Sequence, residues 1–236
     1  MSKKRLLTCI LAGVLLLCIS GVLAYAAINE TNDTQEPKIE DSLFIAGQHL
    51  GALQNEGVGA NAETEIVAEY HGHKISSTIL EYQKNVIDLL VSVGSAQYET
   101  DMEIINRIIK GIMLTEEAER LGIVTTEEEI DEYIKSAMGV YSTPEGKRAM
   151  DAYCQGAGMT LDEYIQMMRE QMPERITHNK LKAEIHKQYC IDNDLEYDRN
   201  APISIDMLAA EKAYIAALFE RNKDDIVYYL DDAEVS

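Results

Sequence analysis

The stretch IINRIIKGIMLTEEAERLGIVTTEEEIDEYI, residues 104–134, decides the fold because it holds one helix, its end and the start of the next. Apolar residues recur in it at three- and four-residue spacing, which predicts one broad apolar stripe on a helix; they are Ile104, Ile105, Ile108, Ile109, Ile112, Ala118 and Leu121. Gly122 follows, where a left-handed residue ends a helix. Thr125 and Thr126 each have a glutamate three residues on, so either predicts a capping box for the next helix. Other helices must cover such a stripe.

The composition limits the size, the core and the partners. A chain of 236 residues has room for one ordinary domain plus a targeting segment. Hydrophobic residues make up 46%, but there is no Trp and there are only 2 Phe, so the core must use Ile, Leu, Met and Tyr. The formal net charge is -20. A surface this acidic repels phosphate backbones, so we expect no nucleic-acid binding.

The N-terminus, residues 1–27, is predicted to be a signal peptide or an N-terminal transmembrane anchor. Residues 3–5 are Lys, Lys and Arg, and residues 6–27 are uncharged. Residues 24–26 read Ala-Tyr-Ala, which fits signal cleavage, whereas about 20 apolar residues suffice to span a bilayer. Basic residues before the run and acidic residues after it place the N-terminus in the cytoplasm. We therefore expect an extracytoplasmic body, tethered to the cell membrane or secreted if the signal is cleaved.

Residues 28–63 are predicted to be a flexible linker. They include polar, acidic and glycine-bearing stretches that could bury little surface. Between these stretches, residues 42–53 could form a short amphipathic helix, but Gly47 and Gly51 both weaken that prediction.

The folded domain is predicted to span residues 64–236. Residues 66–70, Ile-Val-Ala-Glu-Tyr, form a strand-like run, and His71-Gly72-His73 turns the chain. Two histidines that flank a glycine raise the alternative of a metal site. No further ligand lies at a suitable spacing, so we favour a simple turn and expect no metal.

Six helices are expected after the hairpin, one of them at the start of the 104–134 stretch, so the domain is predicted to be mostly α. The first is expected to be capped by Ser77 or Thr78 and to run to about Val93, and the second is the helix that opens the 104–134 stretch. The others are expected at 127–138, from Pro144 to about Gly156, from Leu161 to about residue 189, and at 206–221. Pro173 should kink or split the long helix that contains it. Residues 190–204 are predicted to be a loop, and residues 226–230 a terminal strand.

No catalytic motif is recognisable in the sequence, and we expect no enzyme activity and no cofactor. His178 and His186 lie eight residues apart, on one face of the predicted long helix and among charged residues. A surface position is the simpler interpretation, and a general base the alternative. Cys154 and Cys190 lie in the folded domain, and we predict free thiols because nothing in the sequence brings them within bridging distance.

Methionine is abundant, with 10 residues. Because its side chain adapts to varied partners, it is common on promiscuous binding surfaces, although it also fills cores that lack aromatic residues. We favour the core for most of them. Met167, together with Met168 and Met172, is the best candidate for a peptide-binding groove.

Three segments resemble the N-terminal chaperone domain of the SurA/PrsA foldases. Residues 67–75 resemble the family's first strand and its Asn-Gly turn, with His71 in place of the asparagine. Residues 113–130, MLTEEAERLGIVTTEEEI, resemble the end of its long helix, and residues 158–164, GMTLDEY, resemble a later helix start. The resemblance covers about residues 64–190, and the motifs are structural rather than catalytic. It implies a SurA N-terminal-like helical domain whose last helix packs back on the body.

The chain departs from this family at residues 190–204. Family members usually carry a parvulin-type prolyl isomerase domain at that place, and this chain has only a loop. The resemblance therefore implies an exported, ATP-independent chaperone that binds unfolded or extended polypeptides and lacks prolyl isomerase activity. The alternative is a membrane-anchored interaction subunit for one specific envelope protein.

Overall fold

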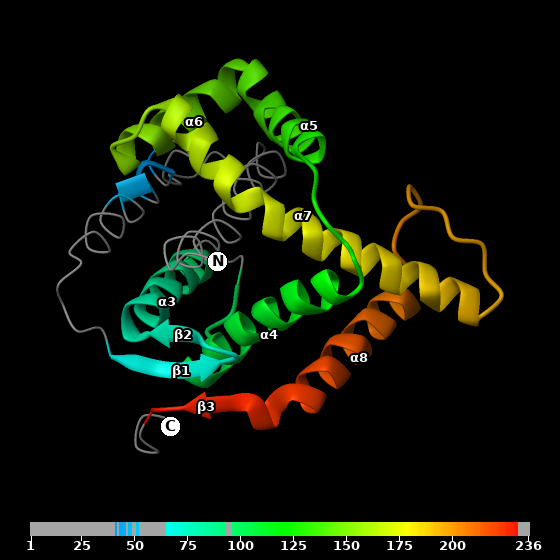
Figure 1. The fold of residues 1–236 in the computed structure, drawn as a ribbon. Helices are drawn as coiled ribbons and strands as arrows, with labels where there is room; N and C mark the ends of the chain where they lie inside the picture. Colours follow the sequence, from blue (N-terminus) through cyan, green and yellow to red (C-terminus); the bar gives the residue numbers. More distant parts are fainter. Residues whose placement is uncertain are drawn as a thin grey trace.

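The computed structural model describes residues 65–92 and 96–230, together with seven positions between residues 41 and 51. It is mostly helical, as predicted, with a small sheet (Figure 1). The elements are β1 (Ile66–Tyr70), β2 (His73–Ser76), α3 (Ser77–Ser92), α4 (Asp101–Arg120), α5 (Glu127–Ala137), the 3-10 helix η1 (Met138–Ser142), α6 (Pro144–Ala157), α7 (Leu161–Asp192), α8 (Ile205–Asn222), the 3-10 helix η2 (Lys223–Asp225) and β3 (Ile226–Tyr228).

The sheet joins the two ends of the folded domain, in the order β2-β1-β3 with both pairs antiparallel. His71 and Gly72 form the turn between β1 and β2, with φ of 46° and 79°. Two-residue hairpin turns of the commonest type need positive φ at both positions, and histidine is among the residues that tolerate it. The predicted turn and the predicted terminal strand are both confirmed.

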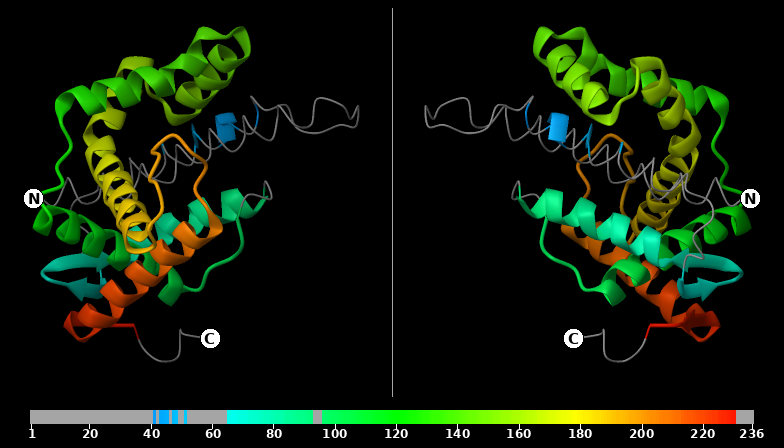
Figure 2. Two further views of the ribbon diagram at one scale, coloured as in Figure 1. Left: turned by 90° about the vertical axis from the view of Figure 1, so that its right-hand side faces the viewer. Right: turned by 90° about the vertical axis from the view of Figure 1, so that its left-hand side faces the viewer.

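Two hydrophobic clusters make up the core, and α7 contributes to both. The first contains the sheet, α3, α4, Leu218 of α8, and Leu181 and Ile185 from the second half of α7. The second contains α5, α6, the first half of α7 and Leu43. In Figure 2, α5 and α6 lie toward one end of α7, and the sheet with α3 and α4 lies toward the other. The clusters consist mostly of Ile, Leu, Met, Tyr and Ala, as the composition requires.

The corner between α4 and α5 confirms the prediction made from residues 104–134. Gly122 has φ 70°, and the amide of Ile123 donates to Ala118 O at 2.9 Å, which closes α4 with a Schellman motif. Of the two possible caps, Thr126 closes the capping box of α5 with Glu129. Thr125 instead donates to the carbonyl of Pro173 at 3.0 Å and so attaches the corner to α7.

The long helix α7 is one helix of 32 residues that includes Pro173, so the proline does not split it. The last helix, α8, packs back on the first cluster through buried Leu218 and partly buried Ile215 and Phe219, as predicted. Leu208 lies in the first turns of α8, where the helix leaves the loop, and is 41% exposed.

The predicted linker, residues 28–63, falls mostly outside the described residues. The described positions between 41 and 51 are helical. Residues 1–27 also lie outside the described part, so the predicted signal or anchor is not visible. Within the described residues, no helix is long and apolar enough to cross a membrane.

Candidate functional site

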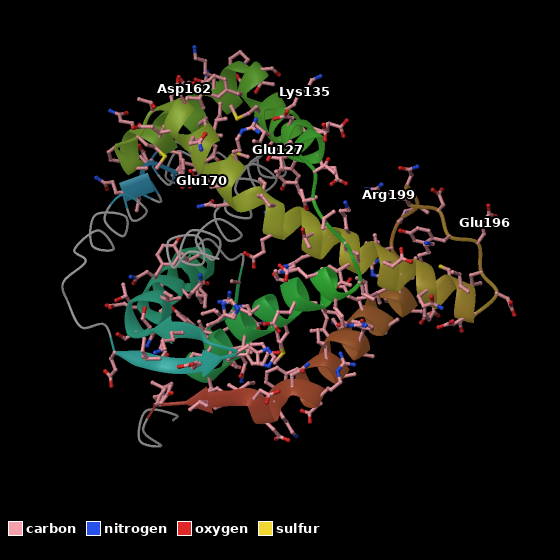
Figure 3. The ribbon with its side chains drawn as sticks, in the orientation of Figure 1. Glu127, Lys135, Asp162, Glu170, Glu196 and Arg199 are labelled. Atoms are coloured by element: carbon pink, nitrogen blue, oxygen red, sulfur yellow. The ribbon has the colours of Figure 1, made fainter. Side chains whose placement is uncertain are left out.

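An open groove of about 530 Å³ lies between α5, the second half of α7 and the loop of residues 193–204 that leads into α8. Figure 3 shows this loop standing away from α7, with Glu196 and Arg199 on it. The lining combines apolar and charged side chains: Glu129, Glu132, Tyr133, Ile176, Asn179, Lys180, Lys182, Ala183, His186, Tyr197, Asp198, Arg199, Ala201, Ile203 and Met207. We call it the α5–α7 groove.

A salt bridge holds the wall of the groove that α5 forms. Lys180 of α7 donates to both carboxylate oxygens of Glu129, at 2.8 and 2.9 Å, and also to the carbonyl of Val124. The bond from Lys180, followed by the bond from the Thr126 amide, lowers the pKa of Glu129. Glu129 therefore stays ionised at neutral pH and keeps the start of α5 against α7.

A second set of polar contacts holds α8 against α7 beside the groove. His186 is buried and lies 2.9 Å from a carboxylate oxygen of Glu211 through its Nε2 atom. The other oxygen of Glu211 accepts from Lys182 at 2.9 Å. The two contacts attach α8 to α7 next to the groove. Both α5 and α8 are therefore held against α7 by side-chain contacts.

Exposed apolar side chains are frequent in the sequence that runs from the end of α7 through the loop into α8. The described residues expose twelve large apolar side chains, and five of them lie in the 18 residues from 191 to 208: Ile191, Leu195, Ile203, Ile205 and Leu208. Ile205 is the most exposed of all, at 83%. Ile203 also lines the groove. Apolar side chains at a groove are typical of binding sites.

The three predicted groove methionines lie elsewhere, in the second hydrophobic cluster. Met168 and Met172 are 1% and 0% exposed, and Met167 is partly buried against the same cluster. Met168 and Met172 therefore fill a core that has few aromatic residues. A ligand could reach them only if that cluster opened.

His71 and His73 both approach Glu116 of α4, at 3.0 and 3.9 Å, and His71 also lies 3.6 Å from Asp225. These contacts attach the hairpin to α4 and to η2. The described residues contain no group of three or more His, Cys, Asp or Glu side chains that could hold a metal ion.

The expectation that His178 and His186 are on the surface is wrong. The side chains are 18% and 5% exposed, because helix α4 covers His178 and helix α8 covers His186. Thr115 of α4 donates to the carbonyl of Gly111, and its oxygen lies 2.9 Å from His178 Nε2. Which of these two atoms is the donor depends on the tautomer of the imidazole.

The two cysteines of the described part, Cys154 and Cys190, are free and buried, as predicted. Burial, followed by the nearby carboxylate of Asp151, raises the pKa of Cys154 to about 11. Its thiol is therefore protonated and unreactive at neutral pH.

Sequence reasoning missed the residues that the α5–α7 groove takes from the loop and from α8. Tyr197, Ile203 and Met207 come from a segment that we predicted only as a loop and a helix start. One signal was available: Ile203 and Ile205 are apolar residues on either side of Ser204, the N-cap of α8, just after the mostly polar residues 192–200.

Comparisons with known proteins do not add to this description. No protein-family model, curated protein or solved structure matches the chain. The candidate site therefore depends on its own geometry.

Proposed function

We propose that this protein is an exported, ATP-independent chaperone-like protein that binds unfolded or extended polypeptide in the α5–α7 groove. The single observation that carries the proposal is this open groove, whose lining includes the apolar side chains of Tyr133, Ile176 and Ile203. An extended segment could place alternate side chains against Tyr133, Ile176 and Ile203 while its backbone stays near the polar rim. The resemblance to SurA/PrsA foldases supports the same class of ligand.

We propose that the protein binds polypeptide without catalysing prolyl isomerisation. In the resembled family, the isomerase domain occupies the place that residues 193–204 take here between α7 and α8. We therefore expect no acceleration of prolyl cis/trans exchange, which takes tens of seconds or longer without a catalyst. We also propose that the protein lies outside the cytoplasm and is attached to the membrane, because residues 1–27 have the sequence of a signal or an anchor.

The test is binding of a fluorescently labelled, permanently unfolded polypeptide, followed by anisotropy. We expect Ile203→Asp and Ile205→Asp each to weaken binding at least fivefold, since each places a charge where apolar contact is expected. Both side chains are more than half exposed, so the fold should tolerate the change. Binding should also survive added salt, because apolar contact is not screened.

Tyr98→Asp is the matched control. Tyr98 is 75% exposed and lies just before the start of α4. The groove lies near the opposite end of that helix, about 30 Å away for 20 residues. Equal binding by Ile203→Asp, Tyr98→Asp and the unchanged protein would refute the groove. Binding confined to one envelope protein would favour the interaction subunit.

A further inference from the structure

Glycines mediate an unusually close contact between the segment of residues 41–51 and helix α6. A Cβ atom at Gly47 would lie 2.2 Å from Tyr153 O and 2.7 Å from Ala157 N. On the other side of the contact, a Cβ atom at Gly156 would lie 2.0 Å from Phe44 O. All these neighbours are backbone atoms, which cannot rotate away. The two backbones touch only because both sides lack a side chain there.

The same face of the segment carries an apolar anchor. Leu43, Gly47 and Gly51 recur every four residues, which places them on one side of a helix. Leu43 is 1% exposed and belongs to the second hydrophobic cluster, together with Met168 and Met172. Gly51 meets α6 as well, since a Cβ atom there would lie 2.8 Å from Ala157 O. One buried leucine and two glycines therefore define the contact.

Helix stability alone would favour alanine at these positions, because glycine weakens a helix interior. Gly111 of α4 provides the contrast: a Cβ atom there would meet nothing within 4 Å. At positions 47, 51 and 156 the close backbone contact excludes any larger residue than glycine, and no such contact exists at Gly111.

We propose that the α6 face around Tyr153, Gly156 and Ala157 is a docking site for a short amphipathic helix, and that residues 41–51 are its occupant within the chain. The site selects a helix with the pattern leucine, glycine and glycine at four-residue intervals. Because the segment belongs to the same chain, it binds this face as an intramolecular ligand, for which effective concentrations are on the order of millimolar. This inference does not depend on the α5–α7 groove and can fail or succeed separately.

Hydrogen exchange of the full chain tests whether the segment is docked. We expect Gly47→Ala to raise exchange across residues 41–51 at least tenfold, because the new methyl group meets the α6 backbone. Gly111→Ala, the matched glycine-to-alanine control, should leave this exchange unchanged. The same exchange in Gly47→Ala as in the unchanged protein would overturn the proposal.

A labelled synthetic peptide of residues 41–53 tests whether the α6 face is a site. The Gly47→Ala chain, whose own segment is displaced, should bind the peptide at least tenfold more tightly than the unchanged protein does. A chain with both Gly47→Ala and Gly156→Ala should lose that binding, because Gly156→Ala blocks the face. Equal binding by these two variants would show that the peptide binds elsewhere and would overturn the proposal.

Discussion

His178 should make this protein lose stability between pH 7 and pH 5. Its imidazole lies between α7 and α4, with Nε2 against the hydroxyl of Thr115. Burial, followed by the charge of Lys182, lowers its pKa from 6.5 to about 4. The unfolded chain therefore binds a proton between these values and the folded chain does not. Stability that is present above pH 6.5 is lost as the pH falls.

The expected loss follows from the two pKa values. At 1.36 kcal/mol per pH unit, the full difference is about 3 kcal/mol, and about 2 kcal/mol of it should be lost between pH 7 and pH 5. The hydrogen bond from Arg120 is the main cause that lowers the pKa of Glu117 to about 2. The stability that ionised Glu117 contributes is therefore lost only below pH 4.5. The interval from pH 7 to pH 5 therefore separates the histidine from this carboxylate.

Urea unfolding of the unchanged protein and of His178→Gln, at both pH values, measures the effect. The glutamine amide keeps a donor near Thr115 and does not titrate. We expect the unchanged protein to lose about 2 kcal/mol more than His178→Gln does between pH 7 and pH 5. The comparison cancels the other histidines, which both proteins contain. Equal losses would refute a buried, neutral His178.

Three further changes test the packing of the fold. Gly111→Ala should raise the free energy of unfolding by about 0.5–1 kcal/mol, because it strengthens α4 without a clash; a loss of stability would contradict the open space there. Glu117→Gln should cost about 1.5–3 kcal/mol, since this buried carboxylate accepts from Arg120 and from the Tyr214 hydroxyl of α8; a change below 0.5 kcal/mol would contradict its role, being typical of a surface site. Truncation after Ser204 should lower the melting temperature, because burial of Leu218 alone contributes about 1.5–3 kcal/mol; an unchanged melting temperature would contradict the packing of α8.

Much of the fold could be predicted from local sequence signals. The end of α4 at Gly122, the proline at the start of α6 and the capping box at Thr160 each depend on a few adjacent residues. Such signals act over one helical turn, so they can be recognised without knowledge of the tertiary structure. The cap of α3 was missed by one residue: Ser76, rather than Ser77 or Thr78, accepts from the amide of Ile79.

Other features depend on packing and could not be predicted in this way. The two histidines of α7 lie among charged residues in the sequence, and only the positions of α4 and α8 bury them. Gly47 and Gly51 counted against a helix because glycine lowers helix propensity. Their close approach to the α6 backbone at Tyr153, Gly156 and Ala157 explains the glycines, and this approach is visible only in the folded structure.

The candidate groove could be predicted least. Its floor comes from α7, one wall from α5 and the open side from a loop about twenty residues further along the chain. The methionines of α7 were the best candidates available from composition, and the structure places Met168 and Met172 in the core. No local pattern relates Tyr133 to Ile203, because their proximity follows from the path of the loop.

Suppression of aggregation tests the central claim most directly. An unfolded client that aggregates on dilution would be mixed with the protein, without nucleotide, and light scattering would be followed. We predict that a near-stoichiometric amount of the unchanged protein, or of Tyr98→Asp, delays aggregation, and that Ile203→Asp delays it much less. Aggregation at the same rate with and without the unchanged protein would contradict the proposed function.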